Sequence, residues 1–187
     1  MILPIYVYGM PVLRKVATEI PKDDPTLPDF VRDMFETMLA SDGVGLAAPQ
    51  VGKSLRMFVI DAAEMAEEEE DESLRQFRKA FINPVITEEW GDPEGFREGC
   101  ISIPYIREEV MRPPNIRIEY YDENWEFHRE EYDGVRARII QHEYDHLNGK
   151  LLIDRINPLR RKLLKSKLNA ISRGEVDTDY RIIYPKK

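Results

Sequence analysis

The chain has 187 residues and a net charge of −8, with 42% hydrophobic and 33% charged residues. This balance is typical of a globular domain with a sizeable core, and it excludes disordered and fibrous proteins. No stretch approaches the roughly 18 apolar residues that a membrane-spanning helix needs. The apolar N-terminal segment is interrupted by Pro4, Gly9 and Pro11, and it does not resemble a signal peptide. We therefore expect a cytoplasmic protein without membrane contacts.

The first predicted helix covers residues 28–39, and a strongly acidic segment follows at residues 61–72. The helix is indicated by apolar residues at helical spacing, namely Val31, Phe35, Met38 and Leu39. The acidic segment has eight carboxylates in twelve positions. Because such a block of like charges repels itself and gains little from burial, we expect a solvated, mobile loop.

Four short segments rich in β-branched and aromatic residues predict strands. They cover residues 55–62, 80–86, 115–121 and 125–132, and the last two flank a polar turn, as in a hairpin. A second helix is predicted at residues 135–149, and a third between Pro158 and Gly174. Because the strands cluster between helices and do not alternate with them, the sequence predicts an α+β fold.

The C-terminal part differs from the rest of the chain in its charge. Residues 155–187 contain ten Lys or Arg and only three acidic residues. The predicted helix in this part has an apolar stripe of Leu159, Leu163, Leu164, Leu168 and Ile171. Its basic side chains must then project from the other faces, either as a solvated surface or as a local contact for nucleic acid. An acidic chain is a poor general nucleic-acid binder, so we expect no binding to DNA.

The most informative run is HEYDH at residues 142–146, inside the second predicted helix. Histidines four residues apart lie on one helical face and can bind the same metal ion. Glu143 lies beside the first histidine, where its carboxylate can act on a water at the metal. The alternative is a pair of exposed or hydrogen-bonded histidines. Because Val135 and Ile139 extend the histidine face as an apolar stripe, a buried metal site is the favoured interpretation.

A tetrahedral catalytic site uses three protein ligands and leaves a fourth position open for water. His142 and His146 supply two ligands, but no histidine follows them in the chain. Cys100, the only cysteine, lies in the run EGCIS at residues 98–102. A thiolate is a strong ligand for zinc or iron, although a lone cysteine is often a buried apolar side chain. Beside the histidine pair, Cys100 is the leading candidate for the third ligand.

A third unusual run is GVGLAAPQ at residues 43–50. Its two glycines and two alanines permit a close approach of the backbone, as a tight wall or a substrate groove requires. It lacks the Lys-Ser/Thr ending of a phosphate-binding loop. From spacing alone, the run is interpreted as the end of a helix followed by a tightly packed strand.

The runs GVGLAAPQ, EGCIS and QHEYDHLNG resemble, in this order, the three signature motifs of the peptide deformylase family. They span residues 43–149, and the N-terminal run MILPIYVYGMPVLRK is also similar to family members. Ile101 stands where many members have Leu, a difference that affects only the fine shape of the pocket. The resemblance implies one catalytic domain, residues 1–187, with residues 155–187 as a basic C-terminal helix and tail. Its expected fold is α+β, with antiparallel β-sheets packed around a central metal-binding HExxH helix.

The resemblance also implies an activity, the hydrolytic removal of the formyl group from the initiator methionine of nascent polypeptides, with release of formate. Cys100, His142 and His146 would hold one divalent metal ion, and a water on that ion would be the nucleophile. Fe(II) is the metal expected in the cell, while Zn(II), Ni(II) or Co(II) can occupy the site in the purified protein. Glu143 would act as general acid and base.

Two further groups would hold the formyl oxygen, the side-chain amide of Gln50 and the backbone N–H of Ile101. The pocket for the methionine side chain is expected to be apolar, because an unbranched thioether suits an adaptable apolar slot. The residues expected to bind substrate are Val44, Gly45, Val135 and Ile139.

Two other functions stay open from the residues alone. A zinc endopeptidase of the HExxH type would need a third ligand other than Cys100 and a cleft for internal peptide bonds. A non-catalytic metal-binding or ribosome-associated module would need neither Glu143 nor Gln50. The expected substrate is a nascent peptide that begins with N-formylmethionine. Because some family members dock on the ribosome through a C-terminal helix, the basic stretch is a candidate ribosome contact as well as a candidate solvated face.

Overall fold

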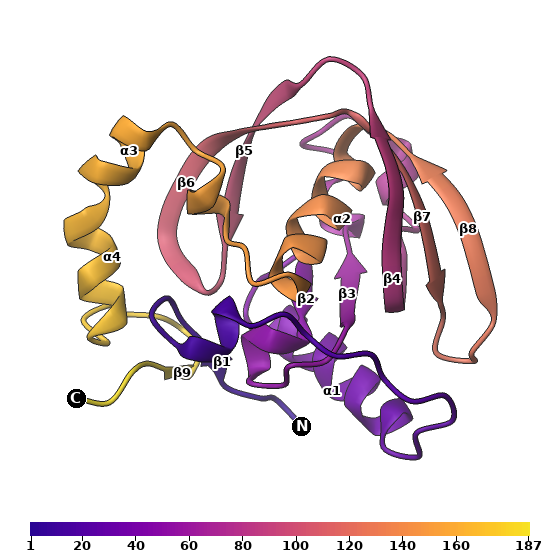
Figure 1. Ribbon diagram of the computed structural model, residues 1–187, viewed down its shortest axis with the longest axis horizontal. Coiled ribbons are helices and arrows are strands. Elements are labelled where there is room, and N and C mark those ends of the chain that lie inside the picture. Colours follow the sequence, from indigo (N-terminus) through magenta and orange to yellow (C-terminus); the bar gives the residue numbers. More distant parts are fainter.

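A five-stranded antiparallel sheet, a two-stranded hairpin and four α-helices build the fold (Figure 1). The computed structural model describes residues 1–187. The large sheet has the order β2 (Gly45–Ala47), β3 (Met57–Asp61), β4 (Arg78–Trp90), β7 (Asn115–Tyr121) and β8 (Phe127–Tyr132). The hairpin pairs β5 (Glu94–Cys100) with β6 (Ile103–Arg112). A short parallel pair joins β1 (Ile5–Tyr6) to β9 (Ile182–Ile183).

The α-helices are α1 (Leu27–Ala40), α2 (Gly134–Leu147), α3 (Pro158–Leu163) and α4 (Lys165–Ser172). Five single-turn 3-10 helices connect the larger elements: η1 (Pro11–Arg14), η2 (Ala48–Val51), η3 (Ala63–Met65), η4 (Glu72–Leu74) and η5 (Leu152–Asp154). All strands of the two main sheets lie between α1 and α2 in the sequence, so the prediction of an α+β fold with antiparallel sheets is confirmed. None of the helices has the length and apolar character required to span a membrane.

The helix α2 lies between the five-stranded sheet and the β5–β6 hairpin (Figure 1). Its apolar residues Ile140 and Leu147 pack against the sheet in a cluster of 17 buried residues that also contains Phe58 and Phe81. Its opposite side faces the hairpin with polar groups, and Arg138 bonds to the Val110 carbonyl of β6. The helix is therefore buried on both sides, one apolar and one polar.

A second core of 26 buried residues lies under α1 and α4. The first predicted helix is confirmed with nearly the predicted bounds, and Val31, Phe35 and Met38 contribute to this core. Leu39 is an exception, because it is 58% exposed at the C-terminal end of α1. Its neighbour Met38 takes the buried position of the last helical turn, so the apolar stripe ends one residue earlier than predicted.

The predicted strands correspond to β3, β4, β7 and β8, and the predicted hairpin is the pair β7–β8. The two strands of the β5–β6 hairpin were not predicted. Charged residues occupy most exposed positions of this hairpin, and Pro104, a residue that is unfavourable in strands, stands near the start of its second strand. The alternating pattern of β6 is therefore masked in the sequence, although Ile106 and Val110 face the core.

The C-terminal basic stretch forms two short helices instead of the single helix that was predicted. The break falls at Leu164, which ends α3 and precedes α4. Only part of the predicted apolar stripe is packed, because Leu164, Leu168 and Ile171 are buried while Leu159 and Leu163 are about two-thirds exposed, at 65% and 64%. None of the residues of α3 is buried, so the predicted apolar stripe is packed only from Leu164 onward.

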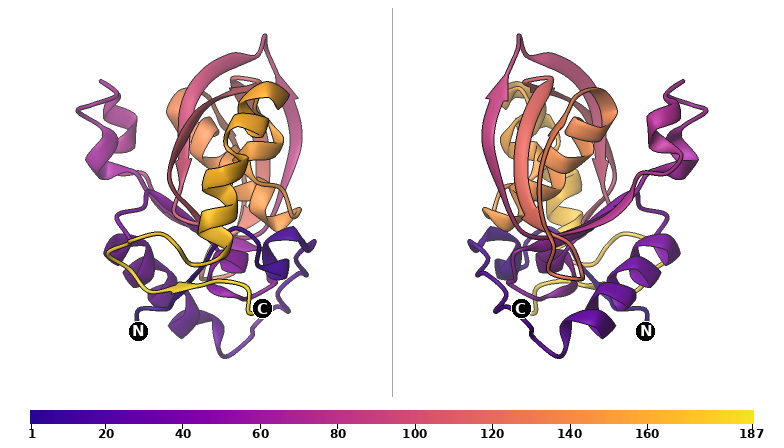
Figure 2. Two further views of the ribbon diagram at one scale, coloured as in Figure 1. Left: turned by 90° about the vertical axis from the view of Figure 1, so that its left-hand side faces the viewer. Right: turned by 90° about the vertical axis from the view of Figure 1, so that its right-hand side faces the viewer.

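The acidic segment 61–72 projects from the body of the molecule (Figure 2). Its carboxylates are mostly exposed, as predicted, but its backbone forms η3 and then enters η4. Ala62, Ala66 and Leu74 are buried in the cluster beneath α2 and anchor this projection. The segment is a solvated loop with two short 3-10 helices, and the alanines between its acids add apolar contacts that the charge pattern did not predict. Its mobility stays a prediction.

Candidate active site

The three candidate metal ligands meet at the junction of the hairpin and α2. Cys100 ends β5, and both histidines belong to α2. One ligand atom each from Cys100, His142 and His146 lies within 4.8 Å of the others. The Sγ atom of Cys100 is 3.5 Å from Nε2 of His146. His142 and His146 follow Cys100 by 42 and 46 positions in the sequence, yet all three side chains can reach one ion.

The ligand-bearing part of α2 is buried and ends in a defined turn. His142 is 8% exposed and His146 only 1%. Burial lowers the pKa of His146 to about 3, which keeps its imidazole neutral, the form that binds a metal. After the helix, Gly149 adopts a φ of 71°, and a Cβ there would lie 2.5 Å from the Arg14 carbonyl oxygen. Only glycine allows this helix end to approach the N-terminal segment so closely.

The carboxyl group of Glu143 is buried next to the candidate ligands. Its Oε1 atom lies 4.0 Å from Nε2 of His142, and its Oε2 atom has no hydrogen-bond partner. Burial raises the pKa of Glu143 to about 7. The backbone of Gly45 packs directly against this side chain, because a Cβ on Gly45 would lie 2.7 Å from Oε1. A carboxyl group with a pKa near neutrality can both accept and donate a proton under ordinary conditions.

The side-chain amide of Gln50 is held in one orientation. Its Oε1 atom accepts a hydrogen bond of 2.9 Å from the Ala47 N–H, so the oxygen points away from the cluster. Its Nε2 atom donates to Ser102 Oγ at 3.1 Å and lies 3.5 Å from Cys100 Sγ. The short helix η2 therefore presents an N–H donor beside the candidate metal ligands.

Ile101 occupies the turn that follows Cys100. Its carbonyl accepts a hydrogen bond of 2.7 Å from the Tyr180 hydroxyl. Its N–H donates to no backbone carbonyl or side chain of the chain. Two donors, the Gln50 amide and the Ile101 N–H, thus lie next to Cys100.

A cavity of about 1180 Å³ opens onto this cluster. The structure brings nearly all predicted site residues to its wall: Val44, Gly45, Gln50, Cys100, Ile101, Ile139, His142 and Glu143. His146 lies behind this wall, within ligand distance of Cys100. Val135 does not line the cavity and packs against the cluster beneath α2. Val135 lies two helical turns before His142 on α2, beyond the end of the cavity.

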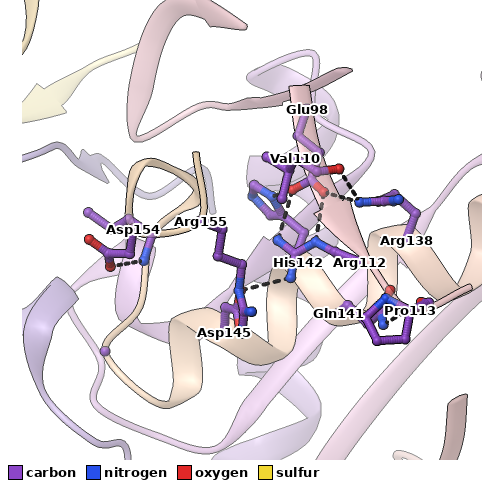
Figure 3. A network of polar contacts seen from close by, with 12 residues as sticks. Glu98, Val110, Arg112, Pro113, Arg138, Gln141, His142, Asp145, Asp154 and Arg155 are labelled. Carbon is purple, nitrogen blue, oxygen red and sulfur yellow. Dashed lines mark hydrogen bonds and ion pairs between the residues drawn. The ribbon is translucent and has the colours of Figure 1, made fainter. Parts of the chain in front are cut away.

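A buried carboxylate orients the first histidine (Figure 3). Nδ1 of His142 lies 2.8 Å from Oε1 of Glu98. Because an ionised carboxylate only accepts, Nδ1 must carry the proton, and Nε2 is left as the ligand atom. Burial alone would raise the pKa of Glu98, but the hydrogen bonds from Arg112 and His142 outweigh it and hold the pKa well below its usual range. Arg138 donates a further bond of 3.1 Å to the same carboxylate.

Arg112 extends this contact into a chain of alternating charges (Figure 3). It donates two hydrogen bonds to Glu98, at 2.7 and 2.9 Å, and a third of 2.9 Å to Asp145. Asp145 also accepts two bonds from Arg155, at 2.5 and 2.7 Å. Glu98 belongs to β5, Arg112 to β6 and Asp145 to α2. One buried guanidinium therefore ties the hairpin that carries Cys100 to the helix that carries both histidines.

Sequence reasoning gave no role to Glu98, Arg112, Arg138 or Asp145. A signal existed for Glu98, because residues two apart on a strand point to the same face and Cys100 follows it by two. Asp145 also stands out as an acid between two histidines of one helix. The arginine partners come from distant positions, and only the fold brings them together.

The donor set fits a divalent transition metal. A thiolate and two imidazoles are the ligands that zinc and iron accept, and they leave a fourth position free for water or substrate. The orphaned Oε2 atom of Glu143 indicates that a further polar group belongs in this space, since buried polar atoms are normally paired.

Comparisons with known proteins point to one family. The family model described as polypeptide deformylase matches residues 2–162. A peptide deformylase of Christiangramia forsetii is 53% identical and aligns with 99% of this chain and 97% of the relative. That of Cytophaga hutchinsonii is 52% identical over the full length of both chains. Among solved structures, peptide deformylase from Plasmodium falciparum has a TM-score of 0.81 at 39% identity and covers 91% of this chain and 95% of its own. The structure from Thermus thermophilus has a TM-score of 0.80 at 37% identity, with 94% and 100% coverage.

The fold and these matches define a hydrolase, with a candidate Cys–His–His metal site at its cavity. Its family match covers most of the chain, and two curated relatives are more than half identical to it over 97% and 100% of their length. The chain belongs to the polypeptide deformylase family, and the resemblance predicted from its three sequence motifs is confirmed.

Proposed function

We propose that the protein removes the N-formyl group from nascent polypeptides that begin with N-formylmethionine and releases formate. The observation that carries the proposal is the position of Glu143, whose buried carboxyl group faces the cavity with one oxygen unpartnered. A purely structural metal site does not require such a group. We further propose that residues 1–187 act as one catalytic domain in the cytoplasm.

Cys100, His142 and His146 would hold one divalent metal ion. Fe(II) is proposed as the metal in the cell, with Zn(II), Ni(II) or Co(II) as alternatives in the purified protein. When bound, the metal would supply a Lewis acid that makes water a usable nucleophile near neutral pH. Glu98 supports the site from outside, since its bond to Nδ1 of His142 fixes the ring and leaves Nε2 for the ion.

Glu143 would move the protons of the reaction. With a pKa of about 7, its carboxylate takes a proton from the water that attacks the formyl carbon. The same carboxyl group then delivers the proton to the nitrogen of the departing amine. The close packing of Gly45 against Glu143 keeps the carboxyl group in place during both transfers.

The negative charge that grows on the formyl oxygen would be met by two fixed donors. The Gln50 amide is already oriented by its bond from the Ala47 N–H, and the Ile101 N–H has no partner within the chain. Donors that are fixed before the reaction need no reorganisation when the charge develops. Removing one such donor typically costs about a hundredfold or more in rate.

The methionine side chain would occupy the apolar part of the cavity. Val44 and Ile139 line this part, and the Gly45 backbone forms a wall beside them. Val135 would contribute only indirectly, through its packing against the same cluster as Ile139.

Formate release from a formyl-Met peptide tests the proposal against the endopeptidase alternative. The assay compares formyl-Met-Ala-Ser with the same peptide without the formyl group, and the products are identified by mass. We expect one formate for each new amino terminus and no cleavage of internal peptide bonds. Cleavage of the unformylated peptide without formate release would support the endopeptidase.

The basic stretch is proposed to contact ribosomal RNA phosphates. Arg160 is paired with Glu108, and Arg161 lies 3.3 Å from Asp154, so these two arginines are engaged within the chain. Lys162, Lys165 and Lys167 are exposed and make no ion pair. Such contacts weaken steeply with added salt, because counterions are released on association.

Cosedimentation with ribosomes at low and high salt tests this contact. The variant Lys162→Gln, Lys165→Gln, Lys167→Gln is compared with a control that changes the exposed residues Lys15, Lys22 and Lys53 to Gln. Both variants lose the same charge. Weaker cosedimentation of the first variant alone would support the contact, and equal behaviour of the two would leave only a solvated basic face.

A further inference from the structure

The C-terminal tail returns from α4 to the wall of the active-site cavity. The pairing of β9 with β1 anchors the tail to the N-terminal segment. Before this pairing, Thr178, Asp179 and Tyr180 line the same cavity as Glu143. These residues lie beyond the family match, which ends at residue 162. They therefore form a part of the cavity wall that the family match does not include.

Two tyrosine hydroxyls connect the tail to the β5–β6 hairpin. Tyr180 donates to the Ile101 carbonyl at 2.7 Å, and Tyr105 donates to the Asp177 carbonyl. Tyr105 adopts a φ of 64°, a left-handed conformation that is rare for a bulky residue. Backbone conformations of this kind persist where the surroundings enforce them. Residues 177–180 of the tail are thus held at both ends, and Tyr180 contacts the turn that follows Cys100.

The turn that Tyr180 contacts has an unfavourable geometry for a hairpin. Cys100 pairs with Ile103, so Ile101 and Ser102 form a two-residue loop. The favoured two-residue loops have a positive φ at their first central residue, because this matches the twist of the strands. Neither Ile101 nor Ser102 has a positive φ. The turn therefore depends on contacts from outside the hairpin.

Three contacts provide this support. The Tyr8 N–H donates to the Ser102 carbonyl at 2.9 Å, and the Gln50 amide donates to the Ser102 hydroxyl at 3.1 Å. The third contact is the Tyr180 hydroxyl on the Ile101 carbonyl. That carbonyl belongs to the central peptide of the turn, the peptide whose rotation converts one turn type into another. The Ile101 N–H belongs to the preceding peptide, between Cys100 and Ile101, and the two peptides share the Cα of Ile101. Anchoring the Ile101 carbonyl therefore restrains that Cα and, through it, the peptide that carries the N–H.

We propose that Tyr180 is a positioning residue of the deformylation site, which holds the Ile101 carbonyl so that the Ile101 N–H stays directed at the formyl oxygen. This inference rests on the proposed function. It assigns a role to the C-terminal tail, which lies outside the three sequence motifs. Burial raises the pKa of Tyr180 above its ordinary value, so its hydroxyl remains a donor over the working pH range.

The test compares Tyr180→Phe with the control Tyr184→Phe in the full chain. Each variant loses one hydroxyl from the tail, but Tyr184 packs beside Gly174 and does not line the cavity. The phenylalanine ring retains the apolar packing of Tyr180, so both variants should melt at similar temperatures. Steady-state kinetics with a formyl-Met peptide, metal content and the amide NMR signal of Ile101 are measured on each protein.

For Tyr180→Phe we expect a loss of about tenfold in kcat, with KM and metal content unchanged. This is less than the hundredfold or more expected for complete removal of an oxyanion donor, because the N–H is displaced and not deleted. The Ile101 amide should also shift and exchange faster with solvent than in Tyr184→Phe. Equal kcat in the two variants, or a lower kcat with an unchanged Ile101 amide, would overturn the inference. A wild-type protein that releases no formate would instead contradict the proposed function.

Discussion

Replacement of Arg112 by methionine tests whether the buried charge network holds the metal site together. The guanidinium is almost fully buried and donates two bonds to Glu98 and one to Asp145. Removing one partner of a buried ion pair typically costs about 3–5 kcal/mol of the free energy of unfolding. Here each carboxylate keeps another cation, Arg138 for Glu98 and Arg155 for Asp145. We therefore expect a loss at the low end of that range, about 3 kcal/mol.

The matched control is Arg155→Met. Arg155 contacts only Asp145, is about one-third exposed at 35%, and has no bond to Glu98. Because exposed ion pairs contribute little, this variant should lose roughly 1 kcal/mol or less. Arg112→Met should also lower metal affinity by about tenfold, since groups that support a metal ligand have effects of this size.

Urea unfolding of the metal-free proteins gives the two free energies, and competition with a chelator gives the two metal affinities. If Arg112→Met loses no more stability than Arg155→Met and keeps the wild-type metal affinity, the network does not hold the hairpin on α2. A loss of stability with unchanged metal affinity would limit the role of Arg112 to folding.

Three further substitutions test individual parts of the site. Cys100→Ser should lower metal content on dialysis, because a neutral hydroxyl replaces a thiolate, and full retention would exclude Cys100 as a ligand. Gly45→Ala should reduce kcat with little change in metal content, since its Cβ would lie 2.7 Å from Oε1 of Glu143 and displace that carboxyl group. Ile139→Ala should raise KM for formyl-Met peptides more than Val135→Ala does, because only Ile139 lines the cavity. Equal values of KM would place the methionine pocket elsewhere.

The elements with strong local patterns were predictable from the sequence. The spacing of apolar residues gave α1, and the glycines at its two ends gave α2, each within about two residues. The β-branched and aromatic runs gave four of the five strands of the large sheet. The third helix was different, since a continuous apolar stripe predicted one helix where two exist. An apolar stripe shows which residues are hydrophobic, but it does not show where a helix is interrupted. The break at Leu164 depends on how this segment packs against the rest of the protein.

The candidate site could be predicted where its residues lie in short runs. The order of the three runs around Gln50, Cys100 and His142 identified the family, and the structure places these side chains around one cavity. The supporting groups were not predictable, because their partners are distant in sequence. Tyr180 lies 79 residues from Ile101, and no local pattern marks it as a contact of that turn.

Glu143 is proposed to transfer the protons of a metal-dependent deformylation. The most direct measurement is formate release by Glu143→Gln and by the wild type, with metal content determined on the same samples. Glutamine keeps the size of the side chain but cannot accept the proton, so we expect full metal content and a loss of at least about a hundredfold in kcat. A fully metallated Glu143→Gln protein that releases formate at the wild-type rate would contradict the account.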